Sequence, residues 1–246
     1  MIDLHSHVLP GLDDGCADVE ESVELARVLA GRGVQVLAAT PHVRTDYPTR
    51  PEQMRAALER VRAAVTQARV PLEIVSGGEI SLEQIALLDA ESLHAFALGT
   101  GGRYLLLEFP HDDFPPHLAE SVESLRHLGL TTILAHPERN PFVQQAPQRL
   151  AGLVSAGALI QVTAGSLTGA FGNSSAEAGR SLVETGLAQL VASDSHHPNG
   201  RPTVADAARH VPRELAQWLT HDVPAAILAG ERPPVPPPRK RRLFGR

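Results

Sequence analysis

Short apolar segments rich in β-branched residues recur along the chain about every 30 residues, and a segment of helical periodicity follows each of them. The predicted strands are residues 2–4, 34–40, 72–76, 104–107, 131–135, 159–163 and 190–192. The predicted helices are residues 19–32, a segment that begins at Pro51, and residues 82–93, 116–128, 148–156, 176–185 and 203–219, the last broken near Pro212. This interval is the length of one strand–helix unit, so the pattern predicts an α/β fold with a parallel sheet.

Side chains that can bind a metal ion follow six of the seven predicted strands. They are His5, His7, Asp14, His42, Glu79, Glu108, His136, Asp194 and His196. Only the strand at 159–163 ends without a strong ligand. A single histidine at the end of a strand is most often a hydrogen-bonded structural residue. Repetition after six strands indicates instead that these residues share one site.

The spacing of strands in a sheet distinguishes between two folds. Adjacent strands lie about 4.8 Å apart, so an open sheet of seven strands would spread these side chains over roughly 29 Å. Metal–ligand bonds are only about 2.0–2.3 Å long, so groups so far apart could not share a cluster. A closed barrel brings the carboxyl ends of all its strands around one mouth. We therefore expect a barrel rather than a doubly wound sheet.

The candidate ligands comprise five histidines, four carboxylates and no thiolate. Mixed nitrogen and oxygen ligation suits manganese, zinc or iron(II) and disfavours iron–sulfur sites. Nine ligands are too many for one ion, so we expect two or three ions that share bridging carboxylates. Three divalent ions would leave the site positive, which suits a phosphate ester. Arg139 in HPER and Arg201 in SDSHHPNGR follow these ligands closely, and their planar guanidinium groups suit phosphoryl oxygens.

Composition and charge limit the classes of partner. The chain has 246 residues and a formal net charge of −6, so we expect no nucleic-acid partner. Cys16 is the single cysteine, and the sequence contains neither a signal peptide nor an apolar stretch of the roughly 18 residues that a membrane span needs. A cytoplasmic protein without membrane insertion is therefore expected. Residues 1–232 are predicted to form one domain, and the proline-rich, basic residues 233–246 a flexible tail.

Six short motifs occur in order along the chain. They are HSH at 5–7, TPH at 40–42, GGE at 77–79, LEFP at 107–110, AHPER at 135–139 and SDSH at 193–196. As an ordered set they resemble the polymerase and histidinol phosphatase (PHP) superfamily. The opening MIDLHSHVLPGLDDG is similar to that of the bacterial manganese-dependent tyrosine-protein phosphatases linked to capsule and exopolysaccharide synthesis. The resemblance covers about residues 1–230.

This resemblance implies a distorted (β/α)7 barrel that holds three metal ions, with the nine residues above as ligands and Arg139 and Arg201 as phosphate clamps. It implies Mn²⁺, with Zn²⁺ or Fe²⁺ as alternatives, and attack on phosphorus by a metal-bound water. The implied partner is a tyrosine-phosphorylated protein, such as a tyrosine autokinase of polysaccharide synthesis, and a homo-oligomer is compatible with it. Val43 stands where many members have a second histidine, which leaves any acid role at that position without support. His111 and His197 fall outside the implied ligand set.

Other classes of protein fit the sequence less well. Histidinol-phosphate phosphatase shares the superfamily site, although the DDG loop and the EFP motif are more typical of the tyrosine phosphatases. A proofreading or scaffold module like those fused to bacterial DNA polymerases is disfavoured, because nothing in the sequence indicates a basic groove. A cysteine-based phosphatase would need arginine at position 22 in its C-x5-R loop, where this chain has Ser22. A GxxxxGK[ST] phosphate-binding loop does not occur either.

Overall fold

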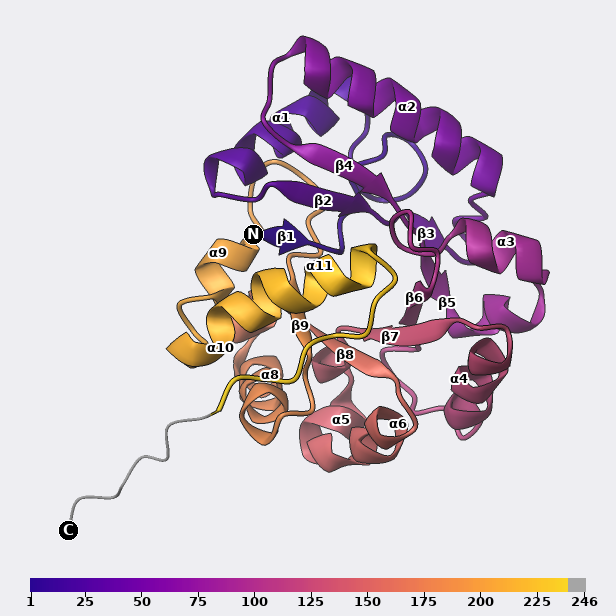
Figure 1. Cartoon of the computed structure of the whole chain (residues 1–246), viewed down its shortest axis with the longest axis vertical. Helices are drawn as coiled ribbons and strands as arrows, with labels where there is room; N and C mark the ends of the chain where they lie inside the picture. The colour runs from indigo at the N-terminus through magenta and orange to yellow at the C-terminus, as the bar shows by residue number, and fades with distance from the viewer. Residues whose placement is uncertain (239–246) are drawn as a thin grey trace.

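Two parallel β-sheets form the centre of the structure, a computed structural model that describes residues 1–238 (Figure 1). The strands are β1 (Ile2–Asp3), β2 (Val36–Ala39), β3 (His42–Val43), β4 (Glu73–Ser76), β5 (Glu79–Ser81), β6 (Tyr104–Glu108), β7 (Thr131–Ala135), β8 (Leu159–Thr163) and β9 (Leu190–Ala192). The smaller sheet has the order β1-β2-β4, and the larger sheet has the order β3-β5-β6-β7-β8-β9. Neighbouring strands in both sheets run parallel, as the strand–helix repeat predicts.

After two of the predicted strands, the chain passes from the smaller sheet to a short, unpredicted strand of the larger one. The second ends as β2 and resumes after Pro41 as β3, and the third ends as β4 and resumes after Gly77 and Gly78 as β5. Proline has no N–H to donate to a strand ladder. A Cβ on Gly77 would lie 2.6 Å from Leu98 Cδ2, and one on Gly78 would lie 2.7 Å from Phe96 Cδ1. The two glycines therefore let the chain bend closely against these buried side chains.

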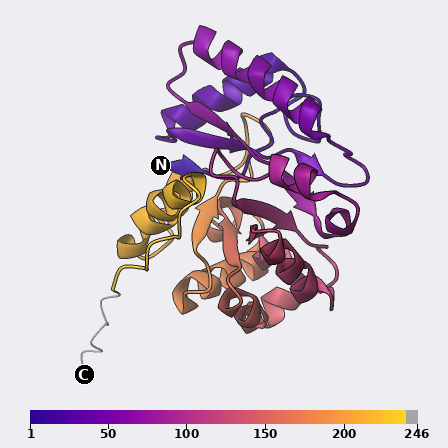
Figure 2. The same cartoon turned by 45° about the vertical axis from the view of Figure 1, so that its right-hand side comes forward.

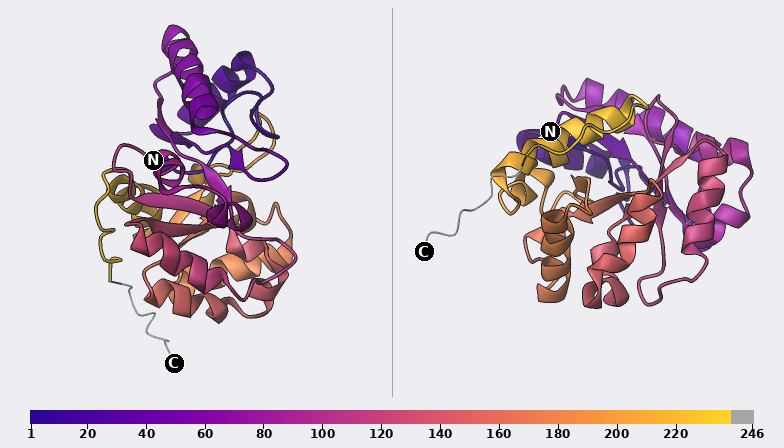
Figure 3. Two further views of the ribbon diagram at one scale, coloured as in Figure 1. Left: turned by 90° about the vertical axis from the view of Figure 1, so that its right-hand side faces the viewer. Right: turned by 60° about the horizontal axis from the view of Figure 1, so that its bottom comes forward.

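Contacts between the first and last strands join the two sheets into a ring. Ser6 and Ser195 form a parallel bridge just beyond β1 and β9. The His7 N–H donates to the Ser195 carbonyl at 2.8 Å, and the Asp194 N–H donates to the His5 carbonyl at 3.0 Å. The strands thus follow one another around the ring in chain order, and helices surround them (Figure 3, right). The parallel sheets confirm the expected α/β fold, and the bridge between Ser6 and Ser195 fits the expected distorted barrel better than an open doubly wound sheet.

Helices cover the outside of both sheets. They are α1 (Val19–Gly31), α2 (Pro51–Gln67), α3 (Ala90–Ala95), α4 (Leu118–His127), α5 (Pro141–Gln145), α6 (Ala151–Ser155), α7 (Ala164–Leu167), α8 (Asn173–Thr185), α9 (Val204–Ala207), α10 (Arg213–Gln217) and α11 (Val223–Leu228). Single turns of other helix types are η1 (Leu82–Ala86), η2 (Pro137–Arg139), η3 (Pro147–Leu150) and the π-helical η4 (Trp218–Asp222). The helices α1 and α2, drawn in indigo and purple, pack over the smaller sheet, and α4, α5, α6 and α8 lie around the larger one (Figures 1 and 2).

The predicted helix at 82–93 is wrong as a single element. The structure divides it into η1 and α3, because Asp89 accepts a hydrogen bond from the Ser92 N–H and so starts a new helix. The break expected near Pro212 is confirmed, since α9 ends before this residue and α10 begins after it. None of the helices within residues 1–238 has the length and apolar character that crossing a membrane requires.

The polypeptide beyond α11 is held to the barrel over its first residues. The Tyr104 hydroxyl donates to the Glu231 carbonyl at 2.6 Å, and the Trp218 indole N–H donates to the Pro234 carbonyl at 2.9 Å. The start of the expected tail is thus attached to the domain. The basic run at 239–242 lies outside the described residues.

Candidate metal centre and active site

All nine predicted ligands converge at the carboxyl ends of the strands. They fall into five overlapping groups in which the candidate ligand atoms lie within 4.8 Å of one another. The groups are His7–Asp14–His42–His196, His5–Glu79–His136, His5–His7–Asp194, Glu108–His111–His136 and His42–Glu79–Glu108. Because neighbouring groups share residues, the side chains form one continuous cluster.

Glu79 lies at the centre of this cluster. Its Oε2 atom is 3.1 Å from His5 Nε2, 3.4 Å from His7 Nε2 and 3.0 Å from His42 Nδ1. Its Oε1 atom is 2.9 Å from His136 Nε2. The pairing of β3 with β5 sets His42 directly opposite Glu79, so the bend after Pro41 places both residues in the site. Burial opposes ionisation of Glu79, but the charges and hydrogen bonds of the surrounding imidazoles outweigh it and hold its pKa well below the usual range.

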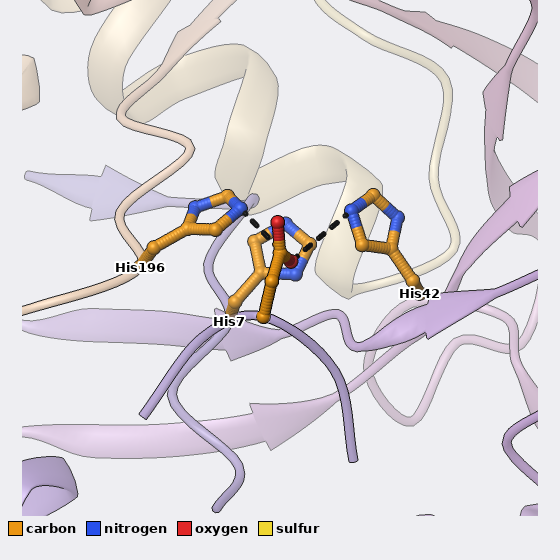
Figure 4. Close-up of side chains that lie close together, drawn as sticks. His7, His42 and His196 are labelled. Atoms are coloured by element: carbon orange, nitrogen blue, oxygen red, sulfur yellow. Dashed lines mark ion pairs between the residues drawn. The ribbon is translucent and has the colours of Figure 1, made fainter. Parts of the chain in front are cut away.

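Two aspartates complete the ring of carboxylates. The Asp14 Oδ1 atom is 3.6 Å from His42 Nε2 and 3.4 Å from His196 Nε2, and these two rings and His7 lie around one point (Figure 4). The Asp194 Oδ1 atom lies 3.4 Å from His7 Nε2. Asp194 has a φ of 56°, a left-handed backbone conformation that non-glycine residues adopt rarely and that concentrates at functional sites.

The imidazole tautomers show that the cluster fits metal ions. His5 Nδ1 is 2.9 Å from Gln161 Oε1, and His7 Nδ1 is 2.7 Å from Asp13 Oδ2. Both acceptors suit Nδ1–H, so each ring presents a lone pair at Nε2 when it is neutral, and these two Nε2 atoms are only 3.2 Å apart. Facing lone pairs repel unless a metal ion or a proton lies between them. Within residues 1–238, Glu79 Oε2 is also buried, and none of its close imidazole contacts has the geometry of a hydrogen bond, which suits a metal ligand.

Three residues of the cluster were missed by the sequence analysis. Asp13 and Gln161 contact the imidazoles of the candidate ligands His7 and His5, and Asp13 Oδ2 also accepts the His42 N–H at 2.9 Å. The DDG motif contained a signal for Asp13, since a second acidic residue directly precedes Asp14. His111 was expected outside the ligand set, but its Nε2 atom lies 3.2 Å from Glu108 Oε1, within reach of the cluster. The structure thus adds it to the candidate ligands, whereas His197 contacts Glu21 of α1.

The two predicted phosphate clamps meet at one carboxylate. Arg139 Nη1 lies 3.2 Å from Asp194 Oδ2, and Arg201 Nη1 donates to the same oxygen and to the Asp194 carbonyl. The Arg139 side chain is 29% exposed and the Arg201 side chain 28%, so both stand at the edge of the cluster. Each guanidinium therefore has donors beside the metal centre and access to solvent.

A cavity of about 650 Å³ opens beside the cluster. Glu108 and His111 belong to both, and Arg44, Glu83 and Phe109 form other parts of the cavity wall. Among the aromatic residues near the cluster, Tyr47 stacks on the His42 ring with centroids 5.9 Å apart. Phe109 is buried and packs edge-on against Phe114, so its main role is loop packing.

Known bacterial proteins are similar in sequence to this chain. The model of the capsular polysaccharide synthesis family CpsB/CapC matches residues 1–227. The tyrosine-protein phosphatase YwqE of Bacillus subtilis is 33% identical over 254 aligned residues, which cover 100% of this chain and 99% of that protein. The tyrosine-protein phosphatase CpsB of Streptococcus pneumoniae is 28% identical over 208 residues, or 82% of this chain and 85% of that one.

Solved structures agree with this relationship. A crystal structure from work on YwqE and CpsB, described there as unique metal-dependent tyrosine phosphatases, has a TM-score of 0.83 at 31% identity and covers 97% of this chain and 100% of its own. A dihydropyrimidinase from Brevibacillus agri reaches a TM-score of 0.57 at 12% identity over 93% of this chain and 70% of its own, which shows likeness of fold alone. The chain belongs to the CpsB/CapC family of capsular polysaccharide synthesis.

Proposed function

We propose that this protein is a metal-dependent protein-tyrosine phosphatase that uses two or three ions, with Mn²⁺ as the preferred metal. The observation that carries the proposal is the convergence of five histidines and four carboxylates on one cluster, with two arginines at its edge. The similar proteins YwqE of Bacillus subtilis and CpsB of Streptococcus pneumoniae are named tyrosine-protein phosphatases. Bound divalent ions would supply Lewis acidity and an activated water.

The residues of the chain have distinct roles in this proposal. The nine clustered side chains and His111 would hold the ions, and Glu79 is placed to bridge them because both its oxygens face imidazole nitrogens. Asp13 and Gln161 would fix the rings of His7 and His5 so that Nε2 faces the centre. Arg139 and Arg201 would bind the phosphoryl oxygens and stabilise the negative charge that develops on them.

The cavity beside Glu108 supports a peptide substrate rather than a small metabolite. A volume of about 650 Å³ exceeds what a phenyl phosphate needs, so it can also accept residues that flank the phosphotyrosine. A tyrosine leaving group, with a pKa near 10, needs less help from an acid than an alkyl alcohol does. The partner in this proposal is a tyrosine-phosphorylated protein such as a bacterial tyrosine autokinase. The proposal includes action in the cytoplasm, and the free, buried Cys16 is compatible with a reducing compartment.

A panel of substrates tests the proposal. A phosphotyrosine peptide, a phosphoserine peptide and histidinol phosphate would be compared after chelation and after return of Mn²⁺. We expect metal-dependent turnover, with the highest kcat/KM for the phosphotyrosine peptide. Glu79→Gln should abolish turnover, and Glu59→Gln on the exposed face of α2 is the matched control. A markedly higher kcat/KM for histidinol phosphate would retain the metal centre and reject the assigned substrate.

A further inference from the structure

We propose that Phe171 is a positioning residue that holds the guanidinium groups of Arg139 and Arg201 ready for phosphate. The inference rests on the proposed function and deepens it, since it concerns how the phosphate-binding side of the same site is organised. Phe171 lies on the segment that follows β8, the one strand for which no ligand was predicted. The position of β8 in the sheet explains why a residue on the segment after it can contact both arginines.

The strand order places Phe171 between the two arginines. In the larger sheet β8 lies between β7 and β9. The polypeptide after β7 carries Arg139 at the end of η2, and the polypeptide after β9 carries Arg201. A side chain on the connection after β8 is therefore flanked on both sides by a phosphate-clamp candidate.

The Phe171 ring contacts both guanidinium groups. The Cζ atom of Arg139 lies 5.0 Å from the ring centroid, and the Cζ atom of Arg201 lies 5.6 Å from it. Both distances are within the roughly 6 Å over which an aromatic face attracts a cation. Asp194 is the carboxylate that the two arginines share, so the aromatic ring and this carboxylate together hold the pair.

Gly165 in α7 allows the ring to occupy this position. A Cβ on this glycine would lie 2.6 Å from Phe171 Cε2 and 2.7 Å from Cζ, so the ring rests directly on the helix backbone. The Phe171 N–H also donates to the Gly165 carbonyl at 3.3 Å. The Phe171 ring thus packs against the backbone of α7 at Gly165 and also contacts the guanidinium groups of Arg139 and Arg201.

An aromatic support suits a phosphate clamp better than a second carboxylate would. Two positive side chains near one another repel, and Asp194 would be engaged by a metal ion in the loaded enzyme. A carboxylate in place of Phe171 would occupy N–H donors, whereas an aromatic face attracts the cation without accepting its in-plane hydrogen bonds. The guanidinium N–H groups accordingly remain available for phosphoryl oxygens.

Substitutions of Phe171 test this arrangement in the metal-loaded protein. Phe171→Leu keeps an apolar side chain but removes the aromatic face, and we expect kcat/KM for phenyl phosphate to fall about 5- to 30-fold. Inhibition by inorganic phosphate should weaken in parallel, while metal content stays unchanged. Phe171→Tyr should restore most of the activity. Gly165→Ala, which displaces the ring without removing it, should resemble Phe171→Leu.

Arginine reactivity provides a readout that does not require turnover. Phenylglyoxal modification, followed residue by residue with mass spectrometry, should become faster at Arg139 and Arg201 in Phe171→Leu. Inorganic phosphate should protect both residues less well than in the wild type. Arg60 on the exposed face of α2 is the internal control and should react at an unchanged rate.

The results separate this inference from the proposed function. If phosphotyrosine peptides are not hydrolysed but phosphate protects the arginines only when residue 171 is aromatic, the substrate assignment fails and the role of Phe171 stands. If Phe171→Leu has wild-type kinetics and wild-type arginine reactivity, the role of Phe171 is refuted. A loss of activity that accompanies loss of metal and that Phe171→Tyr does not restore refutes it as well.

Discussion

The Nε2 atoms of His5 and His7 lie 3.2 Å apart, and the Nδ1 atom of each ring is hydrogen-bonded to another side chain. Gln161 on β8 holds the first ring, and Asp13 in the loop after β1 holds the second. Burial opposes a positive charge on both imidazoles, but Glu79 and Asp194 raise the pKa of His5. Asp13, followed by Asp194 and Glu79, raises the pKa of His7, so the surrounding carboxylates favour positive charge at this position. A divalent ion supplies that charge while using the lone pairs that the tautomers direct inward.

Asp13→Ala should lower metal affinity about 10- to 100-fold, the usual effect of removing a carboxylate that orients a ligand histidine. His7 would lose the acceptor at Nδ1, and the His42 N–H would lose the same oxygen. Titration against a competing chelator measures the change, with Glu59→Ala on α2 as the control. Unchanged affinity in Asp13→Ala would mean that this carboxylate does not orient the ligand ring.

Protein purified without chelator should contain two or three transition-metal ions per chain, because the five candidate groups together offer more ligands than one ion can bind. Elemental analysis with a matched protein concentration measures the ratio. The His136→Ala and His196→Ala variants, which affect separate groups, should each lose part of the metal rather than all of it. Full activity at one ion per chain would rule out the multinuclear site.

Arg139→Ala and Arg201→Ala should each lower turnover of a small aryl phosphate about 10- to 150-fold, the loss expected for charge-assisted hydrogen bonds that act in the transition state. Metal content should stay unchanged, because the arginines contact the cluster only through Asp194. Steady-state kinetics and elemental analysis of the same preparations test both statements, with Arg60→Ala as the control. Near-wild-type kinetics in both variants would make these side chains ordinary surface residues.

The proximity of the candidate ligands could be predicted from the sequence because its signal is local. Most of them stand at or just after the end of a strand, and the strands predicted at 131–135, 159–163 and 190–192 coincide with β7, β8 and β9. The barrel fold alone then brings the carboxyl ends of these strands, and the side chains that follow them, together. The short strands β3 and β5 were not expected, since a two-residue or three-residue strand after a bend has no periodicity of its own.

The residues that support the ligands could not be predicted in the same way. Gln161 points into the cluster from the middle of β8, and only the register of the sheet shows that its amide reaches His5. His111 reaches Glu108 through the fold of a loop, and Phe171 contacts two arginines that come from different strands. Helices α5 and α7, with five and four residues, are also too short to produce a helical pattern.

Native protein should resist alkylation at Cys16. This side chain is buried, its Sγ lies 3.5 Å from the His196 carbonyl, and burial raises the pKa of the thiol to about 12. The reactive thiolate is therefore nearly absent at neutral pH. Incubation with iodoacetamide at pH 8 should leave activity and mass unchanged, whereas the unfolded chain should be labelled. Rapid native labelling with loss of activity would contradict the metal-based mechanism.

Two truncations should locate the end of the folded domain. Removal of residues 236–246 should leave activity and Tm unchanged, because the last described hydrogen bond that the terminal segment makes to the barrel is at the Pro234 carbonyl. Removal of residues 231–246 deletes the acceptors of Tyr104 and Trp218, both largely buried. We expect Tm to fall by about 5–10 °C, since two buried donors lose their partners in a chain of this size. Thermal unfolding of both truncated proteins measures the difference. Equal stability of the two would show that solvent replaces these acceptors and that the domain ends before residue 231.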